Sequence, residues 1–362
     1  MKPDKHPETI VQAEQPFNVE PPLNLLRESF VTPKELFYVR NHGSLPEVDP
    51  DNYRLTVSGL VEQALELSLQ QIKNEFPKET VMVALNCAGN RREDLMKVVP
   101  IPGEIPWYAG AIGNAWWGGV PLREILQAAG VKEEARHVAF EGLDEVEEGE
   151  SPNFGGSIPL KKAMSPDVLL AYEMNDQPLS SEHGFPLRVV VGGYIGARSV
   201  KWLSEISLQD APSSNFFQGK SYRLFPPYVR EEPADFSKGL MLGEISVNAA
   251  ICRPMEGEAL PAGSVLVQGY AIAGGERTIE RVDLSTDEGR TWVEANLLED
   301  GEGHPWAWRF WEAELQFGPG QHQIVVRALD SAADTQPADP GSLWNFKGYV
   351  NNAWHKVKVN VR

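Results

Sequence analysis

The chain of 362 residues contains very little cysteine, and this excludes several classes of protein. Its two cysteines, Cys87 and Cys252, are too few for a disulfide framework, so we expect both to be free thiols. The sequence has no C-x-x-C and no H-E-x-x-H pattern, so the usual zinc sites are not indicated. It also lacks the G-x-S-x-G elbow of acyl-transfer enzymes.

Long apolar runs are absent as well. No stretch approaches the roughly 18 apolar residues that a membrane-spanning helix needs. The first residues, MKPDKHPETIVQAEQPF, contain neither the apolar core of a signal peptide nor a twin-arginine signal. The sequence as written therefore predicts a cytoplasmic protein, or a periplasmic one if an export signal has been removed.

Positive charge is scarce, with 33 lysines and arginines against 51 aspartates and glutamates and a net charge of −18. This balance argues against a general binder of nucleic acid or of anionic membranes. A local basic pocket can still bind an anion, because the field of the distant carboxylates is screened by salt. An acidic surface also suits a basic partner protein, although its simplest role is solubility.

Up to about residue 243 the chain shows a mixture of short strands and short helices. Apolar alternation or short apolar runs predict strands at 53–59, 81–85, 137–140 and 187–191, and helical spacing predicts helices at 67–76, 121–129 and 160–164. Thr32 followed by Pro33 is typical of a capped helix start. Because no regular βαβ repeat is present, this part predicts an α+β domain.

The pattern changes after residue 243 to closely spaced short strands. Alternation predicts strands at 264–270, 279–285, 291–295, 306–315, 322–328 and 354–361, with a tight turn at 287–290. Such a series predicts a β-sandwich. We therefore divide the chain into an extended N-terminal arm (1–30), an α+β domain (31–243) and an all-β sandwich (244–362).

Cys87 lies just after the apolar run 81–85, and Arg91 and Arg92 follow it closely. A thiolate is a soft metal ligand and a nucleophile, and nearby cations favour its ionised form. A buried structural cysteine is the alternative interpretation. The chemistry of one thiol is either nucleophilic catalysis, with His42 or His183 as a partner, or ligation of a metal whose other ligands come from a cofactor.

Further basic residues lie beside glycines or strand ends, at 40–43, 183–188 and 192–202. A glycine loop after a strand lets the backbone approach a ligand closely. Arg198 and Lys201 follow this loop and supply positive charge for an anionic ligand. The glycine spacing matches neither a dinucleotide fingerprint nor a P-loop. Several cations around one thiol favour an anionic, phosphate-bearing cofactor and an oxyanion substrate.

Longer motifs resemble the molybdenum domain of the sulfite oxidases and the eukaryotic assimilatory nitrate reductases. They are LNCAGNRR (85–92), GAIGNAWWGG (110–119), LLAYEMN (169–175), HGFPLRVVV (183–191), IGARSVKW (195–202), WNFKG (344–348) and NAWH (352–355). The resemblance extends from about residue 28 to the C-terminus. It implies an α+β molybdopterin-binding domain, then an immunoglobulin-like sandwich that pairs two subunits into a homodimer.

The resemblance also implies roles for individual residues. Cys87 corresponds to the molybdenum ligand. The positions that hold the pyranopterin dithiolene correspond to Arg40, Asn41, His42, Asp144, His183, Arg188, Ser199 and Lys201. The oxyanion pocket corresponds to Arg40, Arg92, Trp107, Tyr222 and Lys347. Sulfite oxidases usually carry arginine at the position of Lys347, and lysine keeps the charge but loses the planar two-pronged fork.

The implied reaction is the oxidation of sulfite to sulfate, with two electrons passed to oxygen or to an external carrier such as a cytochrome. No haem or flavin module is expected on either side of the matched region. Tyr222 favours sulfite, while the segment 351–354 is similar to nitrate reductases. Reduction of nitrate or another oxyanion on the same cofactor is therefore the alternative enzyme, and a metal-free binding or scaffold protein is the alternative of another class.

Overall fold

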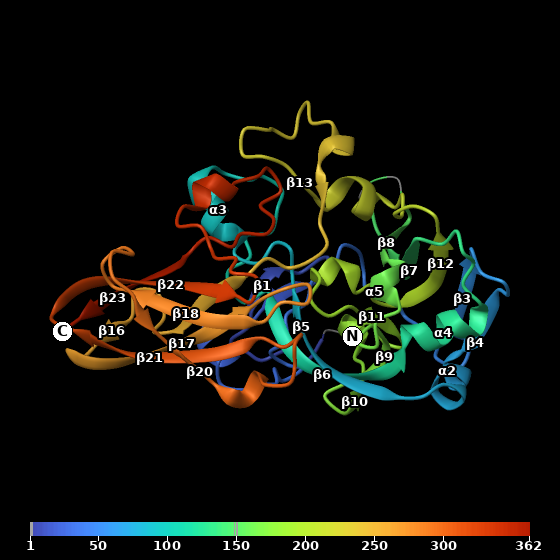
Figure 1. Cartoon of the computed structure of the whole chain (residues 1–362), viewed down its shortest axis with the longest axis horizontal. Coiled ribbons are helices and arrows are strands. Elements are labelled where there is room, and N and C mark those ends of the chain that lie inside the picture. The colour runs from blue at the N-terminus through green and yellow to red at the C-terminus, as the bar shows by residue number, and fades with distance from the viewer. Residues whose placement is uncertain (1–2, 148, 150) are drawn as a thin grey trace.

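The structure is a computed structural model that describes residues 3–147, 149 and 151–362. Figure 1 shows an elongated molecule in which an α+β part and a β-rich C-terminal part lie end to end. No helix among the described residues is long and apolar enough to span a membrane.

Two five-stranded sheets form the frame of the α+β part. One has the order β10-β9-β6-β5 with β11 also paired to β9, and the other has the order β4-β3-β12-β7-β8. Their strands are β3 (Arg54–Gly59), β4 (Leu65–Ser68), β5 (Glu79–Asn86), β6 (Ile112–Pro121), β7 (His137–Glu145), β8 (Asn153–Pro159), β9 (Leu169–Met174), β10 (Gln177–Pro178), β11 (Arg188–Val190) and β12 (Leu203–Gln209). The β12–β3 pair is parallel, and the other pairs of these two sheets are antiparallel. The predicted α+β class is confirmed.

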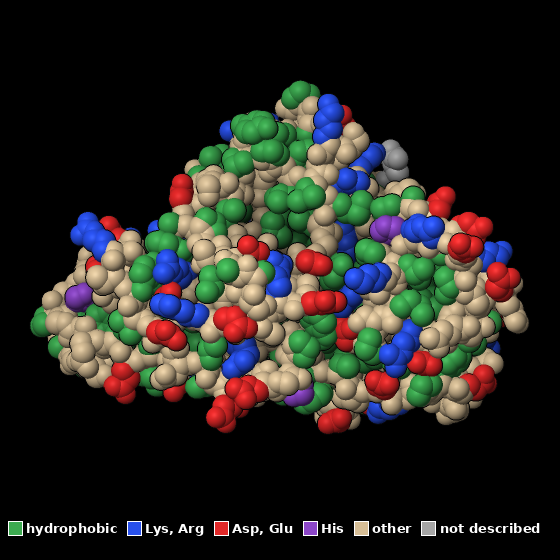
Figure 2. Space-filling view, viewed as in Figure 1, with side chains coloured by type: hydrophobic (Ala, Val, Ile, Leu, Met, Phe, Trp, Pro, Cys, Tyr) green, Lys and Arg blue, Asp and Glu red, His purple; other side chains and the backbone are tan. Residues whose placement is uncertain are grey.

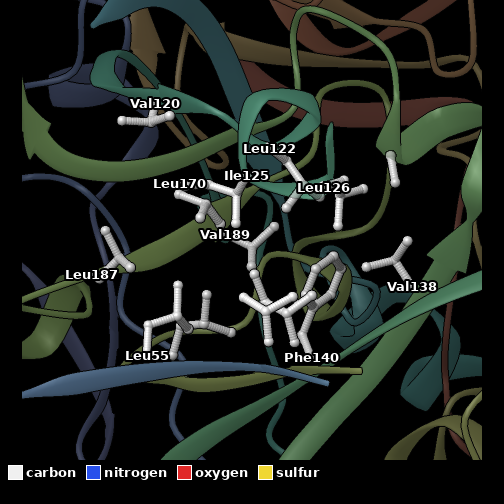
Figure 3. Packing of buried hydrophobic residues seen from close by; sticks show 14 of the residues in the cluster. Leu55, Val120, Leu122, Ile125, Leu126, Val138, Phe140, Leu170, Leu187 and Val189 are labelled. Atoms are coloured by element: carbon white, nitrogen blue, oxygen red, sulfur yellow. The ribbon is translucent and has the colours of Figure 1, made fainter. Parts of the chain in front are cut away.

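The largest core of this part lies between the two sheets (Figure 3). Leu55 and Phe140 come from one sheet, Leu170 and Val189 from the other, and Ile125 from a covering helix. The helices of the chain are α1 (Leu23–Leu26), α2 (Leu69–Glu75), α3 (Arg92–Val98), α4 (Leu122–Ala129) and α5 (Leu160–Ala163). Burial of these apolar side chains is the main driving force that holds the sheets together.

The C-terminal part contains two further sheets with the orders β15-β17-β21-β20 and β16-β23-β22-β18-β19. Their strands are β15 (Asn248–Arg253), β16 (Ala259–Leu260), β17 (Gly263–Ile272), β18 (Ile279–Ser285), β19 (Val293–Glu294), β20 (Asn296–Leu297), β21 (Arg309–Phe317), β22 (Gly320–Asp330) and β23 (His355–Val361). Trp311 of the first sheet and Val326 of the second belong to one buried cluster. The expected sandwich is therefore confirmed.

The N-terminal residues assigned to an extended arm contain a hairpin of β1 (Ile10–Ala13) and β2 (Asn18–Glu20), followed by α1. Val19 exchanges two backbone hydrogen bonds with Val39, at 3.0 and 2.8 Å. This segment is thus packed on the α+β part along β2, all three residues of which are buried.

The helix expected to begin at Thr32 is absent, and the chain forms only a turn at residues 34–36. The Thr32 hydroxyl accepts a hydrogen bond from the backbone N–H of Asn114 instead of capping a helix. A contact with a segment 82 residues away therefore replaced the local cap. The remaining short elements are β13 (Arg223–Leu224), β14 (Leu240–Met241), a π-turn at Phe217–Ser221, and 3₁₀ turns at Ser181–His183, Gly196–Arg198, Phe236–Lys238, Glu299–Gly301 and Pro340–Leu343.

Candidate active site

One cavity collects most of the candidate residues. It lies where the end of β5 meets the segments 37–42 and 182–202. The sequence-predicted residues that line it are Arg40, Asn41, His42, Cys87, Asp144, His183, Arg188, Ser199, Lys201 and Tyr222. Arg92, Trp107 and Lys347 do not line this cavity.

Cys87 directly follows β5 and is buried. Its backbone N–H donates to the Ala111 carbonyl at 2.9 Å, and its Sγ accepts from the backbone N–H of Gly89 at 3.4 Å. Burial raises the pKa of the thiol, while Arg40 and Arg92 act in the opposite direction. The thiol is therefore protonated in the unliganded site, and a bound metal would displace this proton.

Buried cations dominate one end of the cavity. Lys201 donates to the side-chain oxygen of Asn41 and, at 3.0 Å, to the Glu182 carbonyl. Arg188 donates to the carbonyls of His183 and Ser199, both at 3.0 Å. Burial, and then the neighbouring cations, lower the pKa values of Lys201 and His183 well below their usual values. A phosphate-bearing ligand would compensate this concentration of positive charge.

The carboxylate of Asp144 also lies at this end of the cavity. Burial raises its pKa to about 6, and Lys201 opposes the shift. Its Oδ1 atom is buried and has no hydrogen-bond partner among the described residues. Such an unpaired polar atom is unfavourable in a closed site and suits a ligand that supplies a donor.

A hydrogen-bonded chain occupies the other end of the cavity. His42 Nδ1 lies 3.1 Å from Arg40 Nη2, and His42 Nε2 lies 2.9 Å from the Tyr222 hydroxyl. Because a guanidinium can only donate, Nδ1 accepts from Arg40, and the neutral ring donates from Nε2 to the Tyr222 oxygen. The hydroxyl proton of Tyr222 is then directed to another acceptor. Burial raises the pKa of Tyr222 well above its usual value, so it stays protonated.

Arg92 lies beside the cavity at the start of α3. Its Nε donates to the Lys347 carbonyl and its Nη1 to the Ile105 carbonyl, both at 2.9 Å, and its Nη2 lies 3.3 Å from Glu104. The Lys347 ammonium pairs with Glu231 at 2.8 Å and with Glu104 at 3.4 Å. Lys347 is therefore held by two carboxylates.

Trp107 is fully buried, in the same apolar cluster as Cys87 and Phe37. Its indole Nε1 has no hydrogen-bond partner within the described part of the chain. Its unsatisfied donor fits a role toward a bound oxyanion.

Tyr349 is a site residue that sequence reasoning missed. Its ring stacks on Tyr222 with centroids 5.1 Å apart and an interplanar angle of 15°, and the Arg92 guanidinium lies 5.2 Å from its centroid. Burial raises its pKa to about 12, so its hydroxyl also stays protonated. The only available signal was its position two residues after Lys347, directly after the WNFKG motif (344–348).

Arg91 and Arg92, adjacent in sequence, face different surroundings. Arg91 has a left-handed backbone conformation (φ 65°) and is buried away from the thiol. Its Nη1 donates to Asn248 Oδ1 at 2.8 Å and to the Ala353 carbonyl at 2.7 Å, so it joins the motif to the sandwich. Cys252 is buried in β15, and burial raises its pKa to about 12, which agrees with a structural role.

A metal at Cys87 would require ligands from outside the chain. No group of three or more His, Cys, Asp or Glu side chains among the described residues could hold a metal ion. One thiol beside a deep basic cavity fits a metal that arrives with an anionic organic cofactor. The donor set of the cavity therefore fits a molybdenum pterin.

The comparisons with known proteins agree with the family resemblance of the sequence motifs. Two family models match, the oxidoreductase molybdopterin binding domain over residues 42–217 and the Mo-co oxidoreductase dimerisation domain over residues 240–362. Sulfite oxidase of Gallus gallus is 44% identical over 98% of the chain and 78% of its own length. Sulfite oxidase of Arabidopsis thaliana is 41% identical over 99% of the chain and 96% of its own length. The sulfane dehydrogenase SoxCD of Paracoccus pantotrophus superposes with a TM-score of 0.79 at 26% identity, over 97% of this chain and 88% of its own.

Proposed function

We propose, from the fact that this chain belongs to the sulfite oxidase family of molybdenum-dependent oxidoreductases, that it oxidises sulfite to sulfate at a molybdenum bound by Cys87. The observation that carries the proposal is that one cavity is lined by the Cys87 thiol, by the buried Arg188 and Lys201, and by the hydrogen-bonded residues Arg40, His42 and Tyr222.

The basic end of the cavity would hold the organic part of the cofactor. Its residues are Asn41, Asp144, His183, Arg188, Ser199 and Lys201, with Arg40 and His42 toward the thiol. When bound, the molybdenum cofactor supplies oxygen-atom transfer and takes up two electrons. Lys201 and Arg188, both buried, then provide charge compensation.

The other end of the cavity would bind and orient the substrate. Sulfite is a small dianion, and the guanidinium groups of Arg40 and Arg92 supply positive charge close to the thiol. Tyr222 would donate its hydroxyl proton to the substrate, because its oxygen already accepts a hydrogen bond from His42. Trp107 and Lys347 complete the proposed oxyanion pocket, with Lys347 partly neutralised by its carboxylate partners.

Two electrons leave the site after each turnover, and we infer that they pass to oxygen or to an external carrier such as a cytochrome. The C-terminal part matches a dimerisation domain, which supports a homodimer formed through the sandwich. In this proposal the cofactor is a molybdopterin, and no haem takes part within the chain.

Metal analysis tests the assignment of Cys87. We expect about one molybdenum per chain in protein from a cofactor-producing host, lost in Cys87→Ser and retained in Cys252→Ser. The second variant is a matched control, because Cys252 is an equally buried thiol outside the cavity. Wild-type protein that is free of molybdenum, or a Cys87→Ser variant that keeps it, would contradict the proposal.

The oxidation state of the metal separates sulfite oxidation from the alternative nitrate reduction. Sulfite should reduce Mo(VI) in the purified protein, as followed by absorbance and electron paramagnetic resonance. If sulfite leaves Mo(VI) unchanged while nitrate reoxidises the reduced protein, the substrate assignment is wrong.

A further inference from the structure

We propose that Lys5, from the N-terminal segment, is a positioning residue of the cofactor site that fixes the tautomer of His183 and clamps the adjoining wall of the cavity. The inference rests on the proposed function, since it assigns a residue outside the cavity lining to the same molybdopterin site.

The Lys5 ammonium is buried against three acceptors of the chain. Its Nζ lies 2.7 Å from the Lys34 carbonyl, 2.9 Å from the Phe37 carbonyl and 3.0 Å from His183 Nε2. An ammonium has three N–H donors, so these contacts use its full capacity. Lys5 therefore acts on the cofactor through its neighbours and not by direct contact.

The contact with His183 determines which ring nitrogen carries the proton. Burial lowers the pKa of Lys5 to about 8, and below that pH its side chain is an ammonium, which cannot accept a hydrogen bond. Nε2 of His183 is then the acceptor. Burial, followed by Lys5 and Lys201, lowers the pKa of His183 well below its usual value, so the ring is neutral. The ring proton is then on Nδ1, which makes Nδ1 the donor that His183 can offer to an anionic ligand.

The two carbonyl contacts attach the N-terminal segment to the cavity wall. Phe37 begins the wall segment 37–42 and packs edge-on against the His183 ring, with centroids 5.4 Å apart. The Glu182 carboxylate, 3.9 Å from both Lys5 Nζ and His183 Nε2, balances part of the local positive charge. Loss of the Lys5 ammonium would release the wall and the ring together.

Nitrogen NMR of protein labelled with ¹⁵N-histidine tests the tautomer, with and without cofactor. The His183 signal, identified by its loss in His183→Gln, should show a protonated Nδ1 in wild type. Lys5→Met should shift the ring toward the Nε2–H form, and Lys5→Arg should restore the wild-type signal. An Nε2–H ring in the wild-type protein would overturn the inference whether or not the variants fold.

Cofactor retention tests the consequence for binding. In full-length protein, Lys5→Met should lose molybdenum and pterin roughly tenfold faster than wild type, because one charge-assisted contact of the site is removed. Release is followed by metal analysis and by the fluorescence of the oxidised pterin, independently of activity. Lys34→Met is the matched control, since the Lys34 side chain is directed to Gln177 instead of His183.

Equal release from Lys5→Met and Lys34→Met would overturn the assignment. A wild-type protein that never contains molybdenum would instead contradict the proposed function, and the NMR measurement on the cofactor-free chain would still decide the His183 tautomer.

Discussion

Single residues around Arg92 show how positive charge is distributed in the proposed oxyanion pocket. The Lys347 ammonium is shared between Glu231 and Glu104, and Glu104 also lies near Arg92. Lysine lacks the planar fork with which an arginine could hold a carboxylate and an oxyanion together. Lys347 is thus a cation whose charge is partly neutralised by Glu231 and Glu104.

Glu231→Gln should release Lys347 toward the substrate. The Glu231 side chain is half exposed, so the pair contributes up to about 1 kcal/mol, and we expect the KM for sulfite to fall by up to roughly fivefold with little change in kcat. Lys347→Arg should also lower the KM for sulfite. Steady-state kinetics with sulfite measures both, and Glu232→Gln is the neighbouring control. Equal KM values for Glu231→Gln and Glu232→Gln would contradict this account.

At the scale of elements, the N-terminal hairpin supports the loop that carries the site. The Glu20 carboxylate of β2 accepts backbone hydrogen bonds from Tyr108 at 2.8 Å and Gly110 at 2.9 Å. The next residue in the loop, Ala111, accepts the backbone hydrogen bond of Cys87. The hairpin therefore fixes the backbone against which the thiol is placed.

Glu20 should make stability depend on pH. Burial raises its pKa from 4.5 to about 7, so the folded state binds more protons than the unfolded state between these values. The free energy of unfolding should therefore fall by about 3 kcal/mol as the pH rises from 4.5 through 7. Urea denaturation at pH 5 and pH 8 measures this slope.

Glu20→Gln should remove that part of the slope, because an amide does not titrate. Its single oxygen can accept from only one of the N–H groups of Tyr108 and Gly110, so the variant should also lose stability at every pH. A slope equal to that of wild type would show that Glu20 does not titrate in this range.

The elements were predicted well where the signal is local. Strands β3, β5 and β18 and helix α4 lie close to the positions that apolar spacing predicts, because that spacing follows from the geometry of each element. The helix at Thr32 was wrong because a distant backbone N–H uses the hydroxyl. The pairing of Val19 with Val39 has no signal in local spacing.

At the scale of the whole molecule, the two parts are joined through buried polar contacts next to the site. Arg91 donates to Asn248 and to the Ala353 carbonyl, and the Asn351 amide donates to the Arg91 carbonyl at 2.9 Å. The net charge of −18 is not concentrated on the face in Figure 2, where acidic and basic groups are interspersed. The contact between the parts combines these polar partners with a buried apolar cluster to which both parts contribute, for example Ile112 and Trp308.

Arg91→Ala should destabilise the chain by about 3 kcal/mol, because it leaves buried acceptors without their charged donor. Urea denaturation measures the loss, and the exposed Arg290 provides the control variant Arg290→Ala. If the free energy of unfolding falls equally in both variants, the contacts of Arg91 with the sandwich do not contribute as proposed.

The sequence by itself determined the fold class, the presence of a C-terminal sandwich, and the motifs at 85–92, 183–191 and 195–202 that contribute residues to one cavity. These depend on spacing and residue type along the chain. The assignment of Cys87 to the metal stays a prediction. Only the tertiary structure decided that Arg91 faces the sandwich, that Tyr349 stacks on Tyr222, and that Lys5 reaches a histidine 178 residues away. Local patterns carry no information about such pairs, because burial and charge compensation arise only when distant segments pack together.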